Sequence, residues 1–335
     1  MSGPDEAGAP SEAPTRAPRE PVHPLPPTPP SEAKPKPRLS DLQARLLTAS
    51  VLIPWVLFAI AKGGLFVLGT VLVVTLIALR EFYGLIEDKG AHPITAFGLG
   101  AGAALPVVAY LGNEYHATVL LTVTLLVVMI LQLGRREITE SLASISGTFF
   151  GIFYVGWLLS HAVVLREFHG VIVTRYGAAE AARLGVVPDS GAFLLAFTLA
   201  VVVLCDAGAY FAGHAYGKTK LAPRISPGKT VEGAVGGIFA GIVGGLAFKG
   251  LFELWWPELS ACMGWVAAGV YGLLLSPVAI VGDLVESLLK RDAQRKDAGA
   301  VLPGMGGVLD RIDSPLLAIP VMYYLMLFTA FLRLT

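Results

Sequence analysis

The sequence has few charged residues for its length, which argues against an ordinary soluble domain. Only 15% of its 335 residues are charged, whereas soluble domains carry about 25%. The formal net charge is zero, so the composition gives no sign of a nucleic-acid partner. Cysteine is also scarce, because Cys205 and Cys262 are the only two and both fall in apolar runs. They are too few for a disulfide framework or a zinc site, and we expect both to be buried.

Long apolar runs take the place of that charge. The sequence is 54% hydrophobic with a mean hydropathy of +0.67, and runs of roughly 20 residues recur, the length that crosses about 30 Å of hydrocarbon. The runs are continuous rather than alternating, which argues against a β-barrel. We therefore predict an all-α polytopic membrane protein with about nine transmembrane helices and short cytoplasmic loops. The predicted spans are residues 46–61, 64–84, 94–111, 117–134, 143–165, 190–213, 232–250, 259–283 and 314–333.

Residues 1–39 differ from the rest of the chain. They contain 12 of the 23 prolines, mixed with polar residues, and they lack the apolar segment of a signal peptide. Such a composition cannot bury a core, so we predict a disordered, proline-rich cytoplasmic tail. Residues 40–335 are predicted to form one transmembrane domain, and its C-terminal part, residues 200–335, is predicted to carry the catalytic site.

The distribution of lysine and arginine predicts the orientation in the membrane. With the N-terminus in the cytoplasm, 19 of the 25 Lys and Arg residues lie inside and 6 lie outside. Cytoplasmic loops of membrane proteins carry an excess of positive charge. The two polar loops that carry the candidate site residues, residues 214–230 and 286–313, are therefore predicted to be cytoplasmic.

The segment 283–313 contains 11 of the 50 charged side chains of the chain. Asp283 and Glu286 are three residues apart, as are Asp310 and Asp313, so each pair shares a helical face. Two acidic pairs brought together by a returning loop would form an oxygen-rich site for Mg²⁺. The alternative is a charged cytoplasmic loop that only satisfies topology, but acidic residues contribute little to topology.

The same segment also holds groups suited to a polyphosphate. Its cations are Lys290, Arg291, Arg295, Lys296 and Arg311. Its glycines are Gly304, Gly306 and Gly307. The cations would neutralise phosphate charge, and the glycines would let the backbone approach a phosphate closely. Together with the acidic pairs, they predict a metal and phosphate site at the membrane surface.

Asp206 lies late in an apolar run, where a carboxylate costs several kcal/mol unless it is paired, hydrated or bound to a metal. Tyr210 follows four residues later, on the same helical face. We predict that both contact substrate. The alternative is that Asp206 reaches water at the cytoplasmic end of the span or pairs with a lysine.

The segment from Ser226 to Gly233, SPGKTVEG, resembles the start of a helix. Ser226 is the predicted N-cap and Pro227 the first helical residue. The free N–H groups of such a helix start suit an anion, and Lys229 and Thr230 add donors. A P-loop is excluded, because Pro223 occupies the position of its first glycine and no strand precedes it.

Three glycines at four-residue spacing, Gly237, Gly241 and Gly245, give the next apolar run one face of small residues. Such a face usually means close helix packing. The spacing allows that packing to lie inside the chain or between the copies of a homodimer.

At this point the sequence resembles a known family. The stretch SLLKRDAQRKDAGAVLPGMGGVLDRID, from Ser287 to Asp313, is similar to the signature of phosphatidate cytidylyltransferases, the CDP-diacylglycerol synthases. Every fixed position matches except Met305, where the family usually has histidine. GDLVES from Gly282, DAGAYFAGHAYGK from Asp206 and SPGKTVEG also match, with weaker similarity near Arg45 and in the Arg80-Glu81-Phe82-Tyr83 stretch. The resemblance covers roughly residues 40–335.

The resemblance implies the transfer of CMP from CTP to phosphatidic acid, with Mg²⁺ as cofactor and pyrophosphate as second product. A second, monovalent ion is a further hypothesis. The predicted catalytic residues are Asp283, Lys290, Asp310, Arg311 and Asp313. The predicted metal ligands are Asp283 and Asp310, with Glu286 and Asp313 close by. The predicted substrate contacts are Asp206, Tyr210, Ser226, Lys229, Thr230, Glu232, Arg291, Lys296, Asp297, Gly304, Gly306 and Gly307. The bacterial inner membrane is the predicted location, with the active site facing the cytoplasm.

Two other functions are compatible with parts of the sequence. An ion-coupled transporter would use an intramembrane acidic site, although no internal repeat accompanies it. Another CTP-dependent lipid transferase or lipid-alcohol kinase would use a similar phosphate site. Met305 excludes a role here for the family's histidine, and we expect activity to survive because the charged residues are intact.

Overall fold

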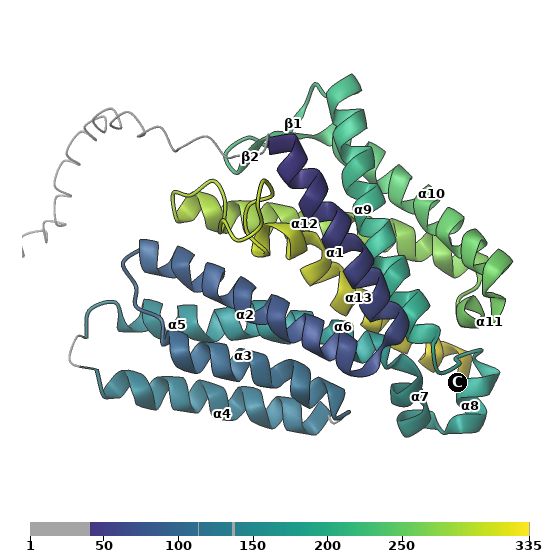
Figure 1. Ribbon diagram of the computed structural model, residues 1–335, viewed down its shortest axis with the longest axis horizontal. Coiled ribbons are helices and arrows are strands. Elements are labelled where there is room, and N and C mark those ends of the chain that lie inside the picture. The colour runs from purple at the N-terminus through teal and green to yellow at the C-terminus, as the bar shows by residue number, and fades with distance from the viewer. Residues whose placement is uncertain (1–40, 113, 136–137, 335) are drawn as a thin grey trace, which may run out of the picture. The chain divides into compact units, whose positions relative to one another are not determined.

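A computed structural model describes residues 41–334, with the exception of residues 113, 136 and 137. The predicted tail, residues 1–39, lies outside the described residues. The described part is almost entirely helical (Figure 1). Its N-terminal helices are α1 (Asp41–Lys62), α2 (Gly64–Asp88), α3 (Thr95–Tyr110), α4 (Glu114–Leu133), α5 (Ser141–Gly151), the π-helix η1 (Ile152–Trp157), α6 (Leu158–Arg166), α7 (Phe168–Tyr176) and α8 (Ala178–Arg183).

The C-terminal half contains four long helices and one small hairpin. Its elements are α9 (Ser190–Tyr216), β1 (Lys220–Ala222), β2 (Ser226–Thr230), α10 (Val231–Trp255), α11 (Pro257–Ser260), α12 (Trp265–Asp292) and α13 (Leu309–Leu334). The strands β1 and β2 are antiparallel. They form a hairpin on the end of α9 and α10, as Figure 1 shows.

The prediction of an all-α polytopic membrane protein is confirmed. Eight helical segments within the described residues are long and apolar enough to cross a membrane. The remaining predicted span, residues 94–111, corresponds to α3, which has only 16 residues. At 1.5 Å per residue it is about 24 Å long, shorter than the ~30 Å hydrocarbon core. Among the described residues, eight full spans and one short apolar helix thus correspond to the nine predicted spans.

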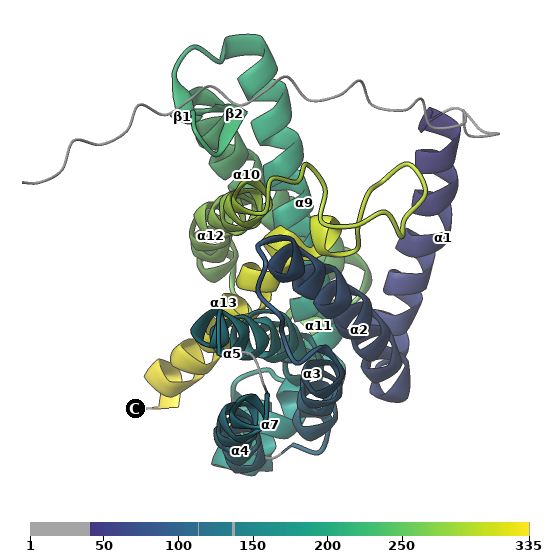
Figure 2. The ribbon, with the colours of Figure 1, turned by 90° about the vertical axis from the view of Figure 1, so that its left-hand side faces the viewer.

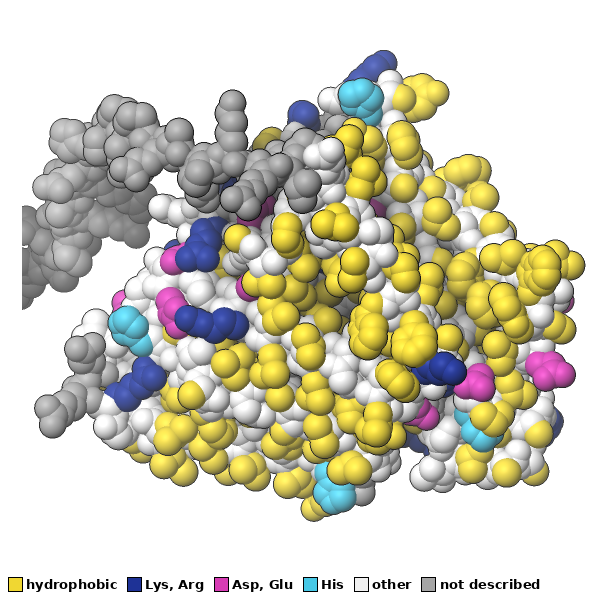
Figure 3. Space-filling view, in the orientation of Figure 1, with side chains coloured by type: hydrophobic (Ala, Val, Ile, Leu, Met, Phe, Trp, Pro, Cys, Tyr) yellow, Lys and Arg dark blue, Asp and Glu magenta, His cyan; other side chains and the backbone are white. Residues whose placement is uncertain are grey.

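The surface is consistent with lipid as the solvent of these helices. In Figure 3, hydrophobic side chains are spread across the visible face, and the charged side chains lie mainly toward its edges. The most apolar window of α1 is only 17% buried within the protein. Its remaining apolar surface therefore needs another apolar medium, which the bilayer provides.

The C-terminal helices pack closely through the predicted small-residue face. A Cβ atom added at Gly237 would lie 2.9 Å from the Cys205 carbonyl oxygen of α9. One added at Gly272 of α12 would lie 2.9 Å from the carbonyl oxygen of Gly241. The prediction of close packing is confirmed. Because this face is filled inside the chain, a homodimer stays a prediction that needs another surface. Cys205 and Cys262 are both buried, as expected.

Two predicted helix ends were wrong. Ser226 and Pro227 do not start a helix, because Ser226–Thr230 is the strand β2. Thr230 is the N-cap of α10, and its hydroxyl accepts a hydrogen bond from the N–H of Gly233 at 3.1 Å. Ser226 and Pro227 do not start the helix because their stretch of backbone pairs with β1 instead. Thr230 then caps the helix four residues later, and threonine is also a favoured N-cap residue.

The second difference concerns the acidic pairs. Helix α12 continues to Asp292, so Asp283 and Glu286 lie within it and not at its end. Helix α13 begins at Leu309, so Asp310 lies in its first turn and Asp313 one turn further along, before Pro315. The hydrophobic runs mark where the membrane ends, whereas a helix continues into water wherever its residues allow it.

Candidate active site

A cavity of about 580 Å³ opens where α9, α10, α12 and α13 meet the β1–β2 hairpin. Its charged lining residues are Asp206, Lys229, Asp283, Lys290, Asp297, Asp310, Arg311 and Asp313. Tyr210, His214 and Thr230 add polar groups to the wall. The fold thus brings the segment from Asp206 to Ala234 together with the segment from Ile280 to Asp313.

The hairpin supplies the cation that meets α12 in this cavity. The Nζ of Lys229 lies 2.6 Å from Oδ2 of Asp283. The hydroxyl of Ser287, one turn further along α12, donates to Oδ1 of Asp283 at 3.3 Å. Both ion-pair partners are partly exposed, so a phosphate or a metal ion entering the cavity can compete for them.

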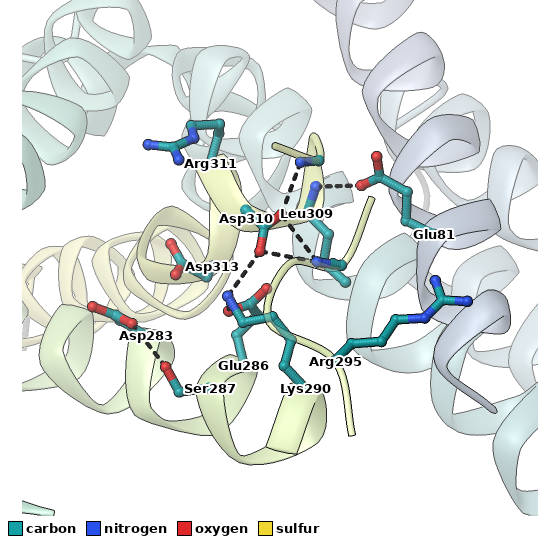
Figure 4. A network of polar contacts seen from close by, with 12 residues as sticks. Glu81, Asp283, Glu286, Ser287, Lys290, Arg295, Leu309, Asp310, Arg311 and Asp313 are labelled. Atoms are coloured by element: carbon teal, nitrogen blue, oxygen red, sulfur yellow. Dashed lines mark hydrogen bonds and ion pairs between the residues drawn. The ribbon is translucent and has the colours of Figure 1, made fainter. Parts of the chain in front are cut away.

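A buried charge network joins α12 to α13 beside the cavity (Figure 4). Lys290 forms ion pairs with Glu286 and, at 2.7 Å, with Oδ1 of Asp310. The Glu286 side chain is 0% exposed, Asp310 is 5% exposed and Lys290 is 13% exposed. Two buried carboxylates therefore share one lysine. Desolvation makes such a network costly to break, because a partner left alone would be an uncompensated buried charge.

Asp310 also holds the loop between the two helices. Its Oδ2 accepts hydrogen bonds from the N–H of Ala298 at 3.0 Å and of Gly307 at 2.8 Å. Within the loop, Gly304 and Gly306 have φ values of 72° and 86°, which favour glycine. The guanidinium of Arg311 donates to the Met305 carbonyl oxygen at 2.7 and 3.0 Å. The PGMGG segment is therefore a tight turn tied to the start of α13.

Three aspartates from three helices direct their charge into the cavity. They are Asp206 of α9, Asp283 of α12 and Asp313 of α13. Like charges in one cavity repel one another, and a bound cation relieves that repulsion. Among the described residues, no three His, Cys, Asp or Glu side chains lie close enough to hold a metal ion by themselves. A metal held here would need further ligands from a substrate.

Comparison with known proteins decides which family this site belongs to. The sequence profile of the Cytidylyltransferase family matches residues 43–329. The chain belongs to the cytidylyltransferase family. A protein of Brucella suis named phosphatidate cytidylyltransferase is 35% identical over 285 residues, which is 85% of this chain and 93% of that protein. A protein of Synechocystis with the same name is 30% identical over 289 residues, 84% of this chain and 94% of that protein.

A third relative is more similar over a shorter stretch. The Bacillus subtilis protein named phosphatidate cytidylyltransferase is 43% identical over 130 residues, which is 39% of this chain and 46% of that protein. The resemblance that the signature between Ser287 and Asp313 indicated is thus confirmed at the level of the family.

The cavity takes in some of the residues predicted for the cytidylyltransferase site and leaves others out. Those that line it are Asp206, Tyr210, Lys229, Thr230, Asp283, Lys290, Asp297, Asp310, Arg311 and Asp313. Those that do not are Ser226, Glu232, Glu286, Arg291, Lys296, Gly304, Gly306 and Gly307.

Three of the residues outside the lining have structural contacts of their own. Glu286 is enclosed with Lys290 and does not face the cavity as a metal ligand would. The carboxylate of Glu232 accepts hydrogen bonds from the N–H groups of Lys218 and Thr219 at 3.1 Å, which ties the hairpin to α10. Arg291 donates to the Ile225 carbonyl oxygen of the hairpin at 3.4 Å.

Contacts from the N-terminal helices to the loop were not predicted. Arg45 of α1 donates to the Gly304 carbonyl oxygen at 2.9 Å, and Thr48 donates to that of Pro303 at 3.0 Å. Figure 2 shows the loop that follows α12 reaching from that helix toward α1. The similarity near Arg45 was the one available signal, and no spacing rule connects residues about 255 positions apart.

Gly282 offers a test of how closely α12 and α13 must approach. A Cβ atom there would lie 2.6 Å from the Asp313 carbonyl oxygen, which is backbone and cannot swing away. We expect Gly282→Ala to separate Asp283 from Asp313, to cost about 1–3 kcal/mol of stability and to lower turnover at least tenfold. Gly269→Ala on the same helix is the matched control, because the nearest neighbouring atom would lie 3.7 Å away. Equal thermal unfolding midpoints and turnover in the two variants would contradict the expectation.

Proposed function

We propose that the protein transfers the CMP group of CTP to phosphatidic acid, forming CDP-diacylglycerol and releasing pyrophosphate. The observation that carries the proposal is the convergence of Asp283, Asp310 and Asp313 with Lys229 and Lys290 around one cavity in a chain of this family. Relatives named for this activity align with most of the chain, which supports the same reaction here.

The reaction needs little proton chemistry. A phosphate oxygen of phosphatidic acid attacks the α-phosphorus of CTP, and a new phosphorus–oxygen bond forms. The bond from the α-phosphorus to the bridging oxygen breaks, and pyrophosphate leaves with the electron pair. A phosphomonoester has a second pKa near ~6, so the attacking group is largely ionised at neutral pH. A nucleophilic serine and a strong general base are therefore unnecessary.

The barrier lies in bringing two polyanions together, and the cations of the cavity lower it. Lys229, Lys290 and Arg311 present positive charge to the cavity from the hairpin, α12 and α13. Positioned cations stabilise the charge that develops on the leaving group. Lys229 pairs with Asp283, so we infer that it exchanges this carboxylate for a substrate phosphate. Lys290 keeps Asp310 in place, and both side chains face the substrate.

The acidic residues suit Mg²⁺ in the same proposal. Mg²⁺ prefers oxygen ligands, and proteins usually hold it with one or two carboxylates together with substrate phosphates. Asp283, Asp310 and Asp313 line the cavity and would supply the carboxylates. Among the described residues no three such side chains lie close enough to hold an ion by themselves, so one or two of these carboxylates would act together with substrate phosphates. When bound, the ion would neutralise phosphate charge and orient CTP. A second, monovalent ion stays a hypothesis.

The placement of the cavity explains how one site can serve a lipid and a water-soluble nucleotide. It opens beside the ends of four apolar helices and the polar hairpin. The acyl chains of phosphatidic acid can stay in the bilayer while its phosphate meets CTP. We propose that this side is the cytoplasm, from the excess of lysine and arginine there. The bacterial relatives support the inner membrane as the location.

An assay of the purified protein in detergent tests the proposal. The protein is given labelled CTP and Mg²⁺ with either phosphatidic acid or diacylglycerol. We expect a CDP-lipid with phosphatidic acid and no product with diacylglycerol. Phosphorylated lipid and CDP from diacylglycerol would instead indicate a lipid-alcohol kinase, and no lipid product in either case would refute the enzyme.

Met305 gives a prediction about the departure from the family signature. Its N–H donates to the Leu302 carbonyl oxygen at 3.0 Å and its carbonyl oxygen accepts from Arg311. Backbone atoms make both contacts, so the side chain is replaceable. We expect Met305→His to change turnover less than about threefold. A gain of tenfold or more in the same assay would show that the missing imidazole limits this protein.

A further inference from the structure

Glu81 is a carboxylate of α2 that contacts the end of the loop between α12 and α13, residues 293–308, and the first residue of α13. More than 200 residues of sequence separate it from these partners. Its Oε1 accepts a hydrogen bond from the Val308 N–H at 3.1 Å, and its Oε2 accepts one from the Leu309 N–H at 2.8 Å. The side chain lies in a helix with apolar neighbours, and the residue is only 8% exposed. In Figure 4 it reaches the start of α13 from the side opposite Asp283.

These two N–H groups lie at the start of α13, because Val308 directly precedes the helix and Leu309 is its first residue. Their position explains why a carboxylate is needed. The first N–H groups of a helix have no partner within it. They also form the positive end of the helix dipole, which favours a negative charge. Glu81 satisfies two of them at once, one with each oxygen. It thereby acts as a cap supplied by another helix, immediately before Asp310.

Two glycines of the loop make room for this carboxylate. A Cβ atom added at Gly307 would lie 2.7 Å from Oε2 of Glu81. One added at Gly299 would overlap Oε1 of Glu81. The loop therefore closes around the end of the Glu81 side chain, and a methyl group at either position would displace it.

The same end of α2 is joined to the other end of the loop. Asp88 forms an ion pair with Arg295, and Lys89 forms one with Asp292 at 3.0 Å. Both pairs are largely exposed and contribute little to stability. Glu81 is the buried contact of the set and is therefore the one expected to set the position of the loop.

We propose that Glu81 is a positioning residue for the cytidylyltransferase site. By capping α13 it fixes the start of that helix, and with it the carboxylates of Asp310 in the first turn and Asp313 just beyond it. It does not line the cavity, so we place it outside the contacts to substrate and metal. The inference rests on the proposed function for its effect on turnover, but the contact itself can be tested without substrate.

The first experiment measures turnover and the Mg²⁺ concentration that gives half-maximal rate. Glu81→Gln keeps the size of the side chain but places an amide N–H against a backbone N–H. We expect turnover to fall at least tenfold and the Mg²⁺ midpoint to rise several-fold, in the range seen when groups that support metal ligands are lost. Glu81→Asp keeps the charge and should recover part of both. A role in folding alone would lower the active fraction and leave the Mg²⁺ midpoint unchanged.

Glu87→Gln is the matched control for this variant. Glu87 lies on the same helix, is more exposed and pairs with Arg80. We expect its turnover and Mg²⁺ midpoint to stay within twofold of the wild type.

The second experiment is a double-mutant cycle with Gly299→Ala. Because the added methyl group collides with the movable end of Glu81, Gly299→Ala should lower turnover in the wild type about as much as Glu81→Ala does. In the Glu81→Ala background it should add less than twofold. Independent effects that multiply would overturn the proposal, because residues that act through one contact are not additive.

The third measurement, amide hydrogen exchange, needs neither substrate nor metal. We expect the amides of Val308 and Leu309 to exchange about tenfold faster in Glu81→Gln than in the wild type and in Glu87→Gln. Unchanged exchange, or lower turnover with a wild-type Mg²⁺ midpoint, would overturn the role of Glu81. A wild-type protein that makes no CDP-lipid would refute the proposed function, and the exchange result would still decide the contact.

Discussion

Replacing Asp283 with asparagine is expected to lower turnover by more than about a hundredfold. Asparagine keeps the shape of the side chain and removes its charge. Asp283 faces the cavity from α12 and pairs with Lys229 at 2.6 Å. Loss of groups that only support metal ligands already costs 10- to 100-fold, so loss of a ligand should cost more. The measurement is the initial rate of CDP-lipid formation at saturating CTP.

Asp292→Asn is the control for this variant. Asp292 ends the same helix and forms an exposed ion pair with Lys89, so its loss should leave the rate within twofold. Raising the Mg²⁺ concentration should restore part of the rate in Asp283→Asn and change nothing in Asp292→Asn. A rate within threefold of the wild type in Asp283→Asn would contradict the assignment of the metal site.

Replacing Lys290 with methionine is expected to remove both activity and much of the stability. Methionine keeps the length of the side chain without its charge. Glu286, which is 0% exposed, and Asp310 would then lose their shared partner. Breaking a buried ion pair from one side costs about 3–5 kcal/mol. The thermal unfolding midpoint in detergent should fall clearly, and turnover should become undetectable.

A second substitution separates the two effects. Glu286→Gln in the Lys290→Met background removes one of the two uncompensated charges. We expect it to recover a large part of the lost stability but no activity, because Asp310 still lacks its partner. If Lys290→Met unfolds at the wild-type midpoint, the buried network does not contribute as described.

Much of the fold follows from the spacing of apolar residues alone. Continuous runs of about 20 residues have one stable form in a bilayer, since a helix satisfies its own backbone hydrogen bonds. The close packing of α10 could also be predicted, from the four-residue spacing of its glycines. In the structure, the neighbours of Gly237 and Gly241 leave no room for a side chain. The lengths of the helices beyond the membrane were not readable, since hydrophobicity carries no information about them.

The sequence predicted which residues lie near the site, but not which of them face the cavity and which support it from behind. The three-residue spacing of Asp283 and Glu286 indicates a shared face, yet one faces the cavity and the other is enclosed with Lys290. Packing against α13 determines which of the two carboxylates faces the cavity. The residues next to Asp283 and Glu286 in the sequence do not reveal that packing. Glu81 shows the same limit, because its partners are backbone N–H groups that have no sequence signature.

The transfer of a CMP group is the central claim, and the position of the label in CTP tests it most directly. The purified protein is given phosphatidic acid, Mg²⁺ and CTP labelled at either the α- or the γ-phosphorus. We predict that the α-label appears in the lipid and the γ-label in pyrophosphate, in equal amounts. Label from the γ-phosphorus in the lipid, or no transfer of the α-label, would contradict the account.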